Sequence, residues 1–113
     1  MVNKVITVIG GRGQMGTRFV HWWCEYGFEV RVLEWNDWHK ASDLLNGINA
    51  AVIAVPIRAT ENVIYQVGKL LQENTVLVDL TSIQSMPLEA MMEAHSGPVL
   101  SLHPMFVQRL RNH

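Results

Sequence analysis

Apolar residues follow two alternating patterns along this chain. In five places Val, Ile, Leu and Ala form short, nearly continuous runs. Such runs are typical of strands that are buried on both faces of a parallel sheet. The predicted strands cover residues 4–9, 28–34, 50–55, 75–80 and 98–103.

Between these runs, apolar residues recur with the period of an amphipathic helix. In the first such stretch Met15, Phe19 and Trp23 fall on one face, and Gly27 ends the helix. Asp and Thr favour helix caps, and proline fits a first helical turn. The predicted helices cover residues 14–26, 37–45 capped by Asp37, 61–72 capped by Thr60, and 87–95 opened by Pro87.

Strands that alternate with helices predict right-handed βαβ units. The expected fold class is therefore α/β, a doubly wound, Rossmann-like parallel sheet with helices on both faces. We expect about five strands in the order 3-2-1-4-5. Ligands of such sheets bind beyond the carboxyl ends of the strands, so the residues that directly follow each strand are the functional candidates.

Composition narrows the class of protein. The chain has 113 residues, 49% of them apolar, which is enough for one domain with its own core. A net charge of −1 without a basic stripe argues against a nucleic-acid partner. The single cysteine fits a reducing compartment, and no apolar run approaches the about 18 residues of a membrane span. We expect a soluble cytoplasmic protein, and the histidine spacing predicts no metal site.

The segment GGRGQMG, residues 10–16, contains a phosphate-binding pattern. Gly11, Gly13 and Gly16 form G-x-G-x-x-G after a predicted strand and at the start of a predicted helix. There the first glycine permits a tight turn, the second lets a diphosphate approach the backbone, and the third lets the helix pack on the sheet. A structural turn is the alternative. The predicted cofactor-binding residues of this segment are Gly11, Arg12, Gly13, Gln14, Met15 and Gly16, although Arg12 fits a solvated position equally well.

A carboxylate, Glu34, ends the second predicted strand. It would accept hydrogen bonds from both ribose hydroxyls and repel a 2′-phosphate, so it favours NAD over NADP; an exposed strand-end charge is the alternative. Further candidates near the middle of the cofactor are Val55, Pro56 and Thr60, for which strand-breaking and capping roles compete evenly. Trp35 and Trp38 in the nearby loop could cover the adenine or pack within the loop.

Two polar residues after the last strands are candidates for catalysis. Ser82 follows the fourth strand, where its hydroxyl can donate to and accept from a substrate or the nicotinamide amide. His103 ends the fifth strand, where a neutral imidazole could accept the proton of a substrate hydroxyl as hydride leaves. A capping serine and a structural, hydrogen-bonded histidine are the respective alternatives.

Several of these segments together resemble a known family. VIGGRGQMG, VIAVPI, VLVDLTSI and VLSLHPMF are similar to the NAD-binding domain of prephenate dehydrogenase, most of all to the form fused to chorismate mutase, over residues 4–106. The resemblance implies NAD-dependent oxidative decarboxylation of prephenate to 4-hydroxyphenylpyruvate in tyrosine biosynthesis. It also implies that His103 assists deprotonation of the ring hydroxyl and that Ser82 lies near that hydroxyl and the nicotinamide.

The chain also departs from the family pattern. Gln84 stands where the family usually has a lysine, and after Phe106 the family continues into a sixth strand and a helical domain. We therefore expect a dinucleotide-binding domain over residues 1–106 and a disordered or truncated tail over 107–113. The isolated chain would be weakly active or inactive; the alternative is a non-catalytic NAD-binding or regulatory module that acts with a partner subunit. Apolar residues near the C-terminus predict a homodimer or a covering partner chain.

Overall fold

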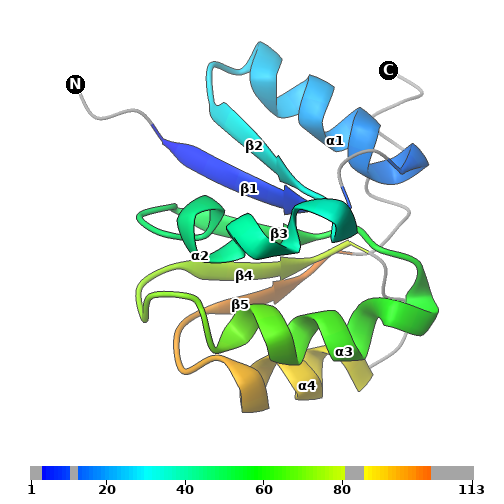
Figure 1. The fold of residues 1–113 in the computed structure, drawn as a ribbon, viewed down its shortest axis with the longest axis vertical. Coiled ribbons are helices and arrows are strands. Elements are labelled where there is room, and N and C mark those ends of the chain that lie inside the picture. The colour runs from blue at the N-terminus through cyan, green and yellow to red at the C-terminus, as the bar shows by residue number, and fades with distance from the viewer. Residues whose placement is uncertain (1–3, 11–12, 81–85, 103–113) are drawn as a thin grey trace.

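A computed structural model describes residues 4–10, 13–80 and 86–102 of the chain. They form one parallel sheet whose five strands are flanked by helices (Figure 1). The strands are β1 (Val5–Ile9), β2 (Glu29–Leu33), β3 (Ala50–Ile53), β4 (Val76–Asp79) and β5 (Val99–Ser101). The helices are α1 (Gln14–Glu25), the 3₁₀ helix η1 (Trp35–Lys40), α2 (Ala41–Leu44), α3 (Ile57–Gly68) and α4 (Met86–Ala94).

The predicted fold class is confirmed, but the predicted strand order is wrong. The observed order is β2-β1-β3-β4-β5, with every neighbouring pair parallel. The third strand therefore lies on the other side of β1 from β2, instead of outside β2. The same order results when the third strand of the order 3-2-1-4-5-6 is removed, so the sheet keeps its doubly wound character.

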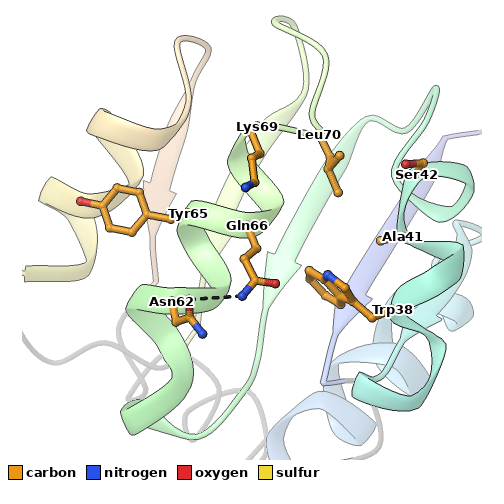
Figure 2. A pocket seen from close by; sticks show the side chains of 8 residues that line it. All are labelled: Trp38, Ala41, Ser42, Asn62, Tyr65, Gln66, Lys69 and Leu70. Atoms are coloured by element: carbon orange, nitrogen blue, oxygen red, sulfur yellow. Dashed lines mark hydrogen bonds between the residues drawn. The ribbon is translucent and has the colours of Figure 1, made fainter.

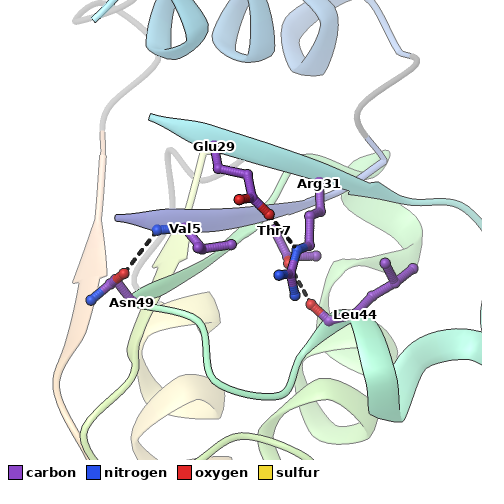
Figure 3. A network of polar contacts seen from close by, with 6 residues as sticks. All are labelled: Val5, Thr7, Glu29, Arg31, Leu44 and Asn49. Atoms are coloured by element: carbon purple, nitrogen blue, oxygen red, sulfur yellow. Dashed lines mark hydrogen bonds and ion pairs between the residues drawn. The ribbon is translucent and has the colours of Figure 1, made fainter. Parts of the chain in front are cut away.

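The polar residues of β2 explain this order. Glu29 and Arg31 lie on one face of β2 and form an ion pair with 3.0 Å between Arg31 Nε and Glu29 Oε2 (Figure 3). An edge strand tolerates such residues because solvent reaches it, whereas a strand between two neighbours is buried. In β3, by contrast, Ala51, Val52 and Ile53 are at most 1% exposed. β3 therefore belongs inside the sheet and β2 at its edge.

Two apolar layers hold the helices on opposite faces of the sheet, as predicted (Figure 1). On one face Phe19 and Trp23 of α1 pack on Ile6, Val8 and Val52. On the other face α2, α3 and α4 cover the sheet. The buried residues of that second layer include Leu33, Leu45, Ile53, Val63, Ile64, Leu77 and Met91.

Hydrogen bonds link β1 to the end of α2 and to the loop between α2 and β3 (Figure 3). The hydroxyl of Thr7, which is fully buried, donates to the carbonyl of Leu44 at 2.5 Å. The backbone N–H of Val5 donates to Asn49 Oδ1 at 2.8 Å. Because a buried hydroxyl needs a partner, Thr7 anchors the end of α2 beside the central strand.

Two predicted helices begin elsewhere than expected. The helix predicted over 37–45 is a 3₁₀ turn followed by the short α2, because the chain turns directly after β2, where Asp37 N donates to Glu34 O at 2.9 Å. Asp37 therefore lies inside the turn rather than at its cap. The helix predicted over 61–72 begins at Ile57, and its N-cap is Pro56. Thr60 lies in its first turn, where its hydroxyl donates to Pro56 O at 3.2 Å.

Candidate functional site

A cavity of about 350 Å³ opens at the carboxyl edge of the sheet. Its walls come from the residues that end or follow three neighbouring strands, β1, β2 and β3, and from the first two turns of α3. The lining residues are Ile9, Gly10, Gly13, Leu33, Glu34, Ala54, Val55, Pro56, Ala59, Asn62 and Val63. The site therefore lies where the predicted topology places ligands, beyond the strand ends.

Gly10 brings the ends of the three strands together. Its N–H donates to Leu33 O of β2 at 3.0 Å, and it has a positive φ of +85°. A Cβ at this position would lie 2.8 Å from Ala54 O, which follows β3. Only glycine combines this backbone conformation with this close approach. The tight turn predicted at Gly11 thus begins one residue earlier, at Gly10; Gly11 and Arg12 lie outside the described residues.

The N-terminus of α1 faces the same edge. Gly13 is its N-cap, and Gly13 N donates to Gly10 O at 3.1 Å, which closes the turn. The first amides of a helix have no acceptor within it, and the first turn of α1 contains no acidic residue. The backbone amides that follow Gly13, at Gln14 and Met15, are therefore suited to an anion. Gly16 is buried in α1; its role in close packing of the helix on the sheet stays a prediction.

Glu34 lines the cavity from the end of β2, as its position in the sequence predicts. It is partly exposed and is the N-cap residue of η1. A partly exposed carboxylate accepts hydrogen bonds without the cost of full burial. This placement suits the recognition of hydroxyl groups.

Of the three candidates around the start of α3, two line the cavity. Val55 and Pro56 form part of its wall. Thr60 is 1% exposed and turns its hydroxyl to the Pro56 carbonyl. Thr60 is thus bonded to a residue of the wall without lining the cavity itself, and its direct contact with a cofactor stays a prediction.

A second hollow, of about 590 Å³, adjoins the first between η1, α2 and α3 (Figure 2). Trp38 lines this hollow and not the first cavity. Asn62 lines both hollows, and no pattern in the sequence indicated it as a site residue. Because α3 was expected to start near Glu61, Asn62 would have been in its first turn. The true start at Ile57 places it in the second turn, beside the cavity.

Comparison with known proteins places the chain in a family. The model of the family "Prephenate dehydrogenase, nucleotide-binding domain" matches residues 30–109. The chain belongs to this family. The resemblance seen in the sequence is thereby confirmed, and the cavity described above lies in a nucleotide-binding domain.

Curated relatives of this nucleotide-binding domain are longer proteins. The T-protein of Enterobacter agglomerans is 46% identical over 103 residues, which are 91% of this chain and 27% of the relative. The T-protein of Haemophilus influenzae is 38% identical over 105 residues, covering 93% and 28%. A probable arogenate/prephenate dehydrogenase of Methanocaldococcus jannaschii is 33% identical over 121 residues, covering 92% and 27%. The chain thus spans about a quarter of the length of these relatives.

Solved structures agree with the fold of the domain. A semialdehyde dehydrogenase NAD-binding protein from Cupriavidus necator, in complex with calcium and NAD, superimposes with a TM-score of 0.58 at 18% identity, covering 70% of this chain and 33% of that one. A conserved hypothetical protein from Sinorhizobium meliloti gives 0.58 at 15% identity, covering 90% and 41%. At these identities the likeness concerns the fold alone.

The two predicted catalytic residues, Ser82 and His103, lie outside the described residues. The strands that precede them in the sequence, β4 and β5, are neighbours in the sheet. At their carboxyl ends the fully buried Asp79 accepts a backbone hydrogen bond from Leu102 N at 2.9 Å. The proximity of Ser82 and His103 to the cavity stays a prediction.

The described part of the chain contains neither a cluster of metal ligands nor a membrane-spanning helix. Within residues 4–10, 13–80 and 86–102, no three His, Cys, Asp or Glu side chains are grouped so that they could hold a metal ion. No helix within these ranges is both long and apolar enough to cross a membrane. The buried His95 belongs to the core: its Nε2 lies 2.6 Å from Thr75 O.

Proposed function

We propose that this chain is the NAD-binding domain of a prephenate dehydrogenase, and that the complete enzyme performs the oxidative decarboxylation of prephenate to 4-hydroxyphenylpyruvate. The observation that carries the proposal is the cavity at the ends of β1, β2 and β3. In this cavity the turn at Gly10, which closely approaches Ala54, lies beside Glu34. Family membership and the names of the curated relatives support the same reaction.

The cavity suits the adenosine half of NAD. Its volume, about 350 Å³, lies within the range of about 300–1,000 Å³ that is usual for small-molecule sites. The amides at the start of α1 would hold the diphosphate beside Gly13, which has no side chain to block its approach to the backbone. Glu34 would accept hydrogen bonds from the ribose hydroxyls. A 2′-phosphate at that ribose would meet the like charge of Glu34, so NADP should bind more weakly.

NAD, when bound, supplies the hydride acceptor for the oxidation. The remaining chemistry belongs to the protein, and we assign it to the two residues selected from the sequence. His103 accepts the proton of the substrate's ring hydroxyl, and Ser82 holds that hydroxyl and the nicotinamide amide in place. Gln84, in place of the usual lysine, removes one positive charge from this region.

The partner of this domain is the second element of the proposal. Leu100 of β5 pairs with Val78, which belongs to the apolar layer beneath α1, yet Leu100 is 47% exposed. Met92 of α4 is 65% exposed. Exposed apolar groups favour association. We therefore infer that the β5 edge of the sheet, together with α4, is covered by a second copy or by a partner chain in the cytoplasm; a monodisperse monomer by light scattering at high concentration would contradict this.

Calorimetric titration of the chain with NAD and NADP tests the cofactor assignment. We expect NAD to bind at least about tenfold more tightly than NADP, because charge repulsion and lost hydrogen bonds together exceed about 1.4 kcal/mol. Glu34→Gln keeps the shape of the side chain and removes its charge, so it should narrow that ratio. If the unaltered chain shows no NAD binding, the proposal is wrong.

The reaction is tested by following NADH absorbance with prephenate as substrate. The complete enzyme, or the chain together with its partner, should lose activity on His103→Asn and retain NAD binding. A variant with unchanged activity would remove His103 from the mechanism, whereas loss of NAD binding would show a structural role instead.

A further inference from the structure

Asn62 is the residue at which the two hollows of the domain meet. It projects from the second turn of α3 and lines both the cavity at the strand ends and the hollow beside Trp38 (Figure 2). Among the residues that line the first cavity, Glu34 bears a carboxyl group and Asn62 a neutral amide, while the other side chains are apolar or absent. Within this cavity, the neutral amide of Asn62 is therefore the group that is suited to recognise a nucleobase by hydrogen bonding.

Gln66 fixes the direction in which the Asn62 amide points. Its Nε2 donates to Asn62 Oδ1 at 3.2 Å, one helical turn away on the same face of α3 (Figure 2). The carboxamide oxygen of Asn62 is thus engaged, and its Nδ2 group remains to donate. In this arrangement Asn62 offers the cavity a hydrogen-bond donor and selects for an acceptor.

The order of groups around the cavity places Asn62 at the far edge of a bound base. The diphosphate end is marked by Gly10 and Gly13, the ribose position by Glu34. Asn62 lies in the second turn of α3, beyond Pro56 and Ala59 of the same wall. The edge of a purine that lies farthest from its sugar contains N1 and the substituent at C6. Leu33 and Val63 also line the cavity and are at most 1% exposed, so they would provide apolar walls for the adenine ring.

We propose that Asn62 is a specificity-determining residue that donates a hydrogen bond to N1 of the adenine ring, and that Gln66 is the positioning residue that orients it. The proposal rests on the NAD binding proposed above. Adenine N1 is an acceptor, whereas N1 of hypoxanthine bears a hydrogen and is a donor. A donor on Asn62 therefore distinguishes the two bases, which otherwise have the same shape at this edge apart from the C6 substituent.

The test compares the dissociation constants of NAD and of nicotinamide hypoxanthine dinucleotide by calorimetry. Asn62 is exposed, so we expect the unaltered chain to bind NAD about three- to tenfold more tightly, the usual effect of one hydrogen bond. Asn62→Ala should bring the ratio close to one. The matched control is Asn46→Ala, an exposed asparagine in the turn after α2 that lines neither hollow, and it should leave the ratio unchanged.

Gln66→Glu provides a second and sharper test. A carboxylate at this position can only accept, so it draws the Nδ2 group of Asn62 toward itself and leaves Oδ1 to face the base. The preference should then shift toward hypoxanthine, with a ratio at or below one. Gln66→Leu should lower the ratio without reversing it, because the amide loses its fixed orientation.

The outcomes separate this inference from the proposed function. If the unaltered chain binds neither dinucleotide, NAD binding itself is wrong. If it binds NAD but the ratio is close to one, or stays the same in Asn62→Ala and Gln66→Glu, then NAD binds and Asn62 does not read the base. Circular dichroism of each variant keeps loss of folding distinct from loss of selectivity.

Discussion

Substitution of Gly10 by alanine should destabilise the domain more than substitution of any other glycine that has a positive φ in the described residues. Gly10, Gly27 and Gly47 have φ values of +85°, +90° and +70°. Alanine in this region of backbone conformation costs roughly 1–2 kcal/mol. At Gly27 and Gly47 that is the whole effect, because a Cβ there would meet nothing within 4 Å.

Gly10 adds a steric term to this conformational cost. Its new Cβ would lie 2.8 Å from Ala54 O and 3.0 Å from Val55 Cγ1. The first of these atoms is backbone, so the ends of β1 and β3 must move apart, and overpacking of this kind costs typically about 1–3 kcal/mol. We therefore expect Gly10→Ala to lower the free energy of unfolding by about 2–5 kcal/mol, and Gly47→Ala by about 1–2 kcal/mol.

Urea denaturation of the two variants measures this difference directly. The conformational term is common to both, so the excess of Gly10→Ala over Gly47→Ala reports the close approach alone. The same displacement moves the wall formed by Ala54 and Val55, so Gly10→Ala should also weaken NAD binding, while Gly47→Ala should not. Equal losses of stability in the two variants would refute the reasoning, because the strand ends would then have room for a side chain.

Three further predictions concern the second face of the sheet. Gly68→Ala would place a Cβ 2.5 Å from a carbonyl oxygen of α4, so it should destabilise the domain by more than about 1 kcal/mol in urea; a neutral result would contradict the packing of α3 on α4. His95→Ala leaves the buried carbonyl of Thr75 without its imidazole partner and should cost about 1–3 kcal/mol, and an unchanged midpoint would remove this contact from the core. The hydrogen bond to Glu93, assisted by desolvation and by the nearby negative charge, raises the pKa of Tyr65 above 10.0. Its contribution to stability is therefore present below pH 10 and lost as pH rises through the raised pKa; absorbance titration should give a lower pKa in Glu93→Gln, and no change would rule out this cause.

Local sequence patterns were sufficient to predict the strands, the fold class and the end of β2 that presents Glu34. These features can be predicted from periodicity and from single residues at strand ends, which are properties of short segments. The order of strands was not predictable in the same way, because it depends on the side of β1 to which the chain returns after β2. Glu29 and Arg31 do contain a signal for this, since charged residues on one face of a strand favour the sheet edge.

The site was predicted in part for a similar reason. The glycine run indicated a phosphate site, but only the structure assigns the positive φ and the contact with Ala54 to Gly10. Asn62 was missed because the start of α3 was predicted four residues late. Thr60 has the chemistry of a cap, whereas Pro56 has the fixed φ that begins the helix, and the proline decided the outcome. An error of one helical turn was enough to hide a residue of the site.

The position of the cavity has a consequence for how mutations should act. Its walls come from β1, β2, β3 and α3, and none of its described residues belongs to β4 or β5. The residues that we assign to the chemistry, Ser82 and His103, follow β4 and β5 in the sequence. If these two groups act as proposed, changes at Gly10, Glu34 or Asn62 should alter the affinity for NAD, and changes after β4 and β5 should lower kcat at saturating NAD. The two halves of the reaction, holding the cofactor and moving the proton, are thus assigned to different strands of one sheet, and this division makes them separable by measurement.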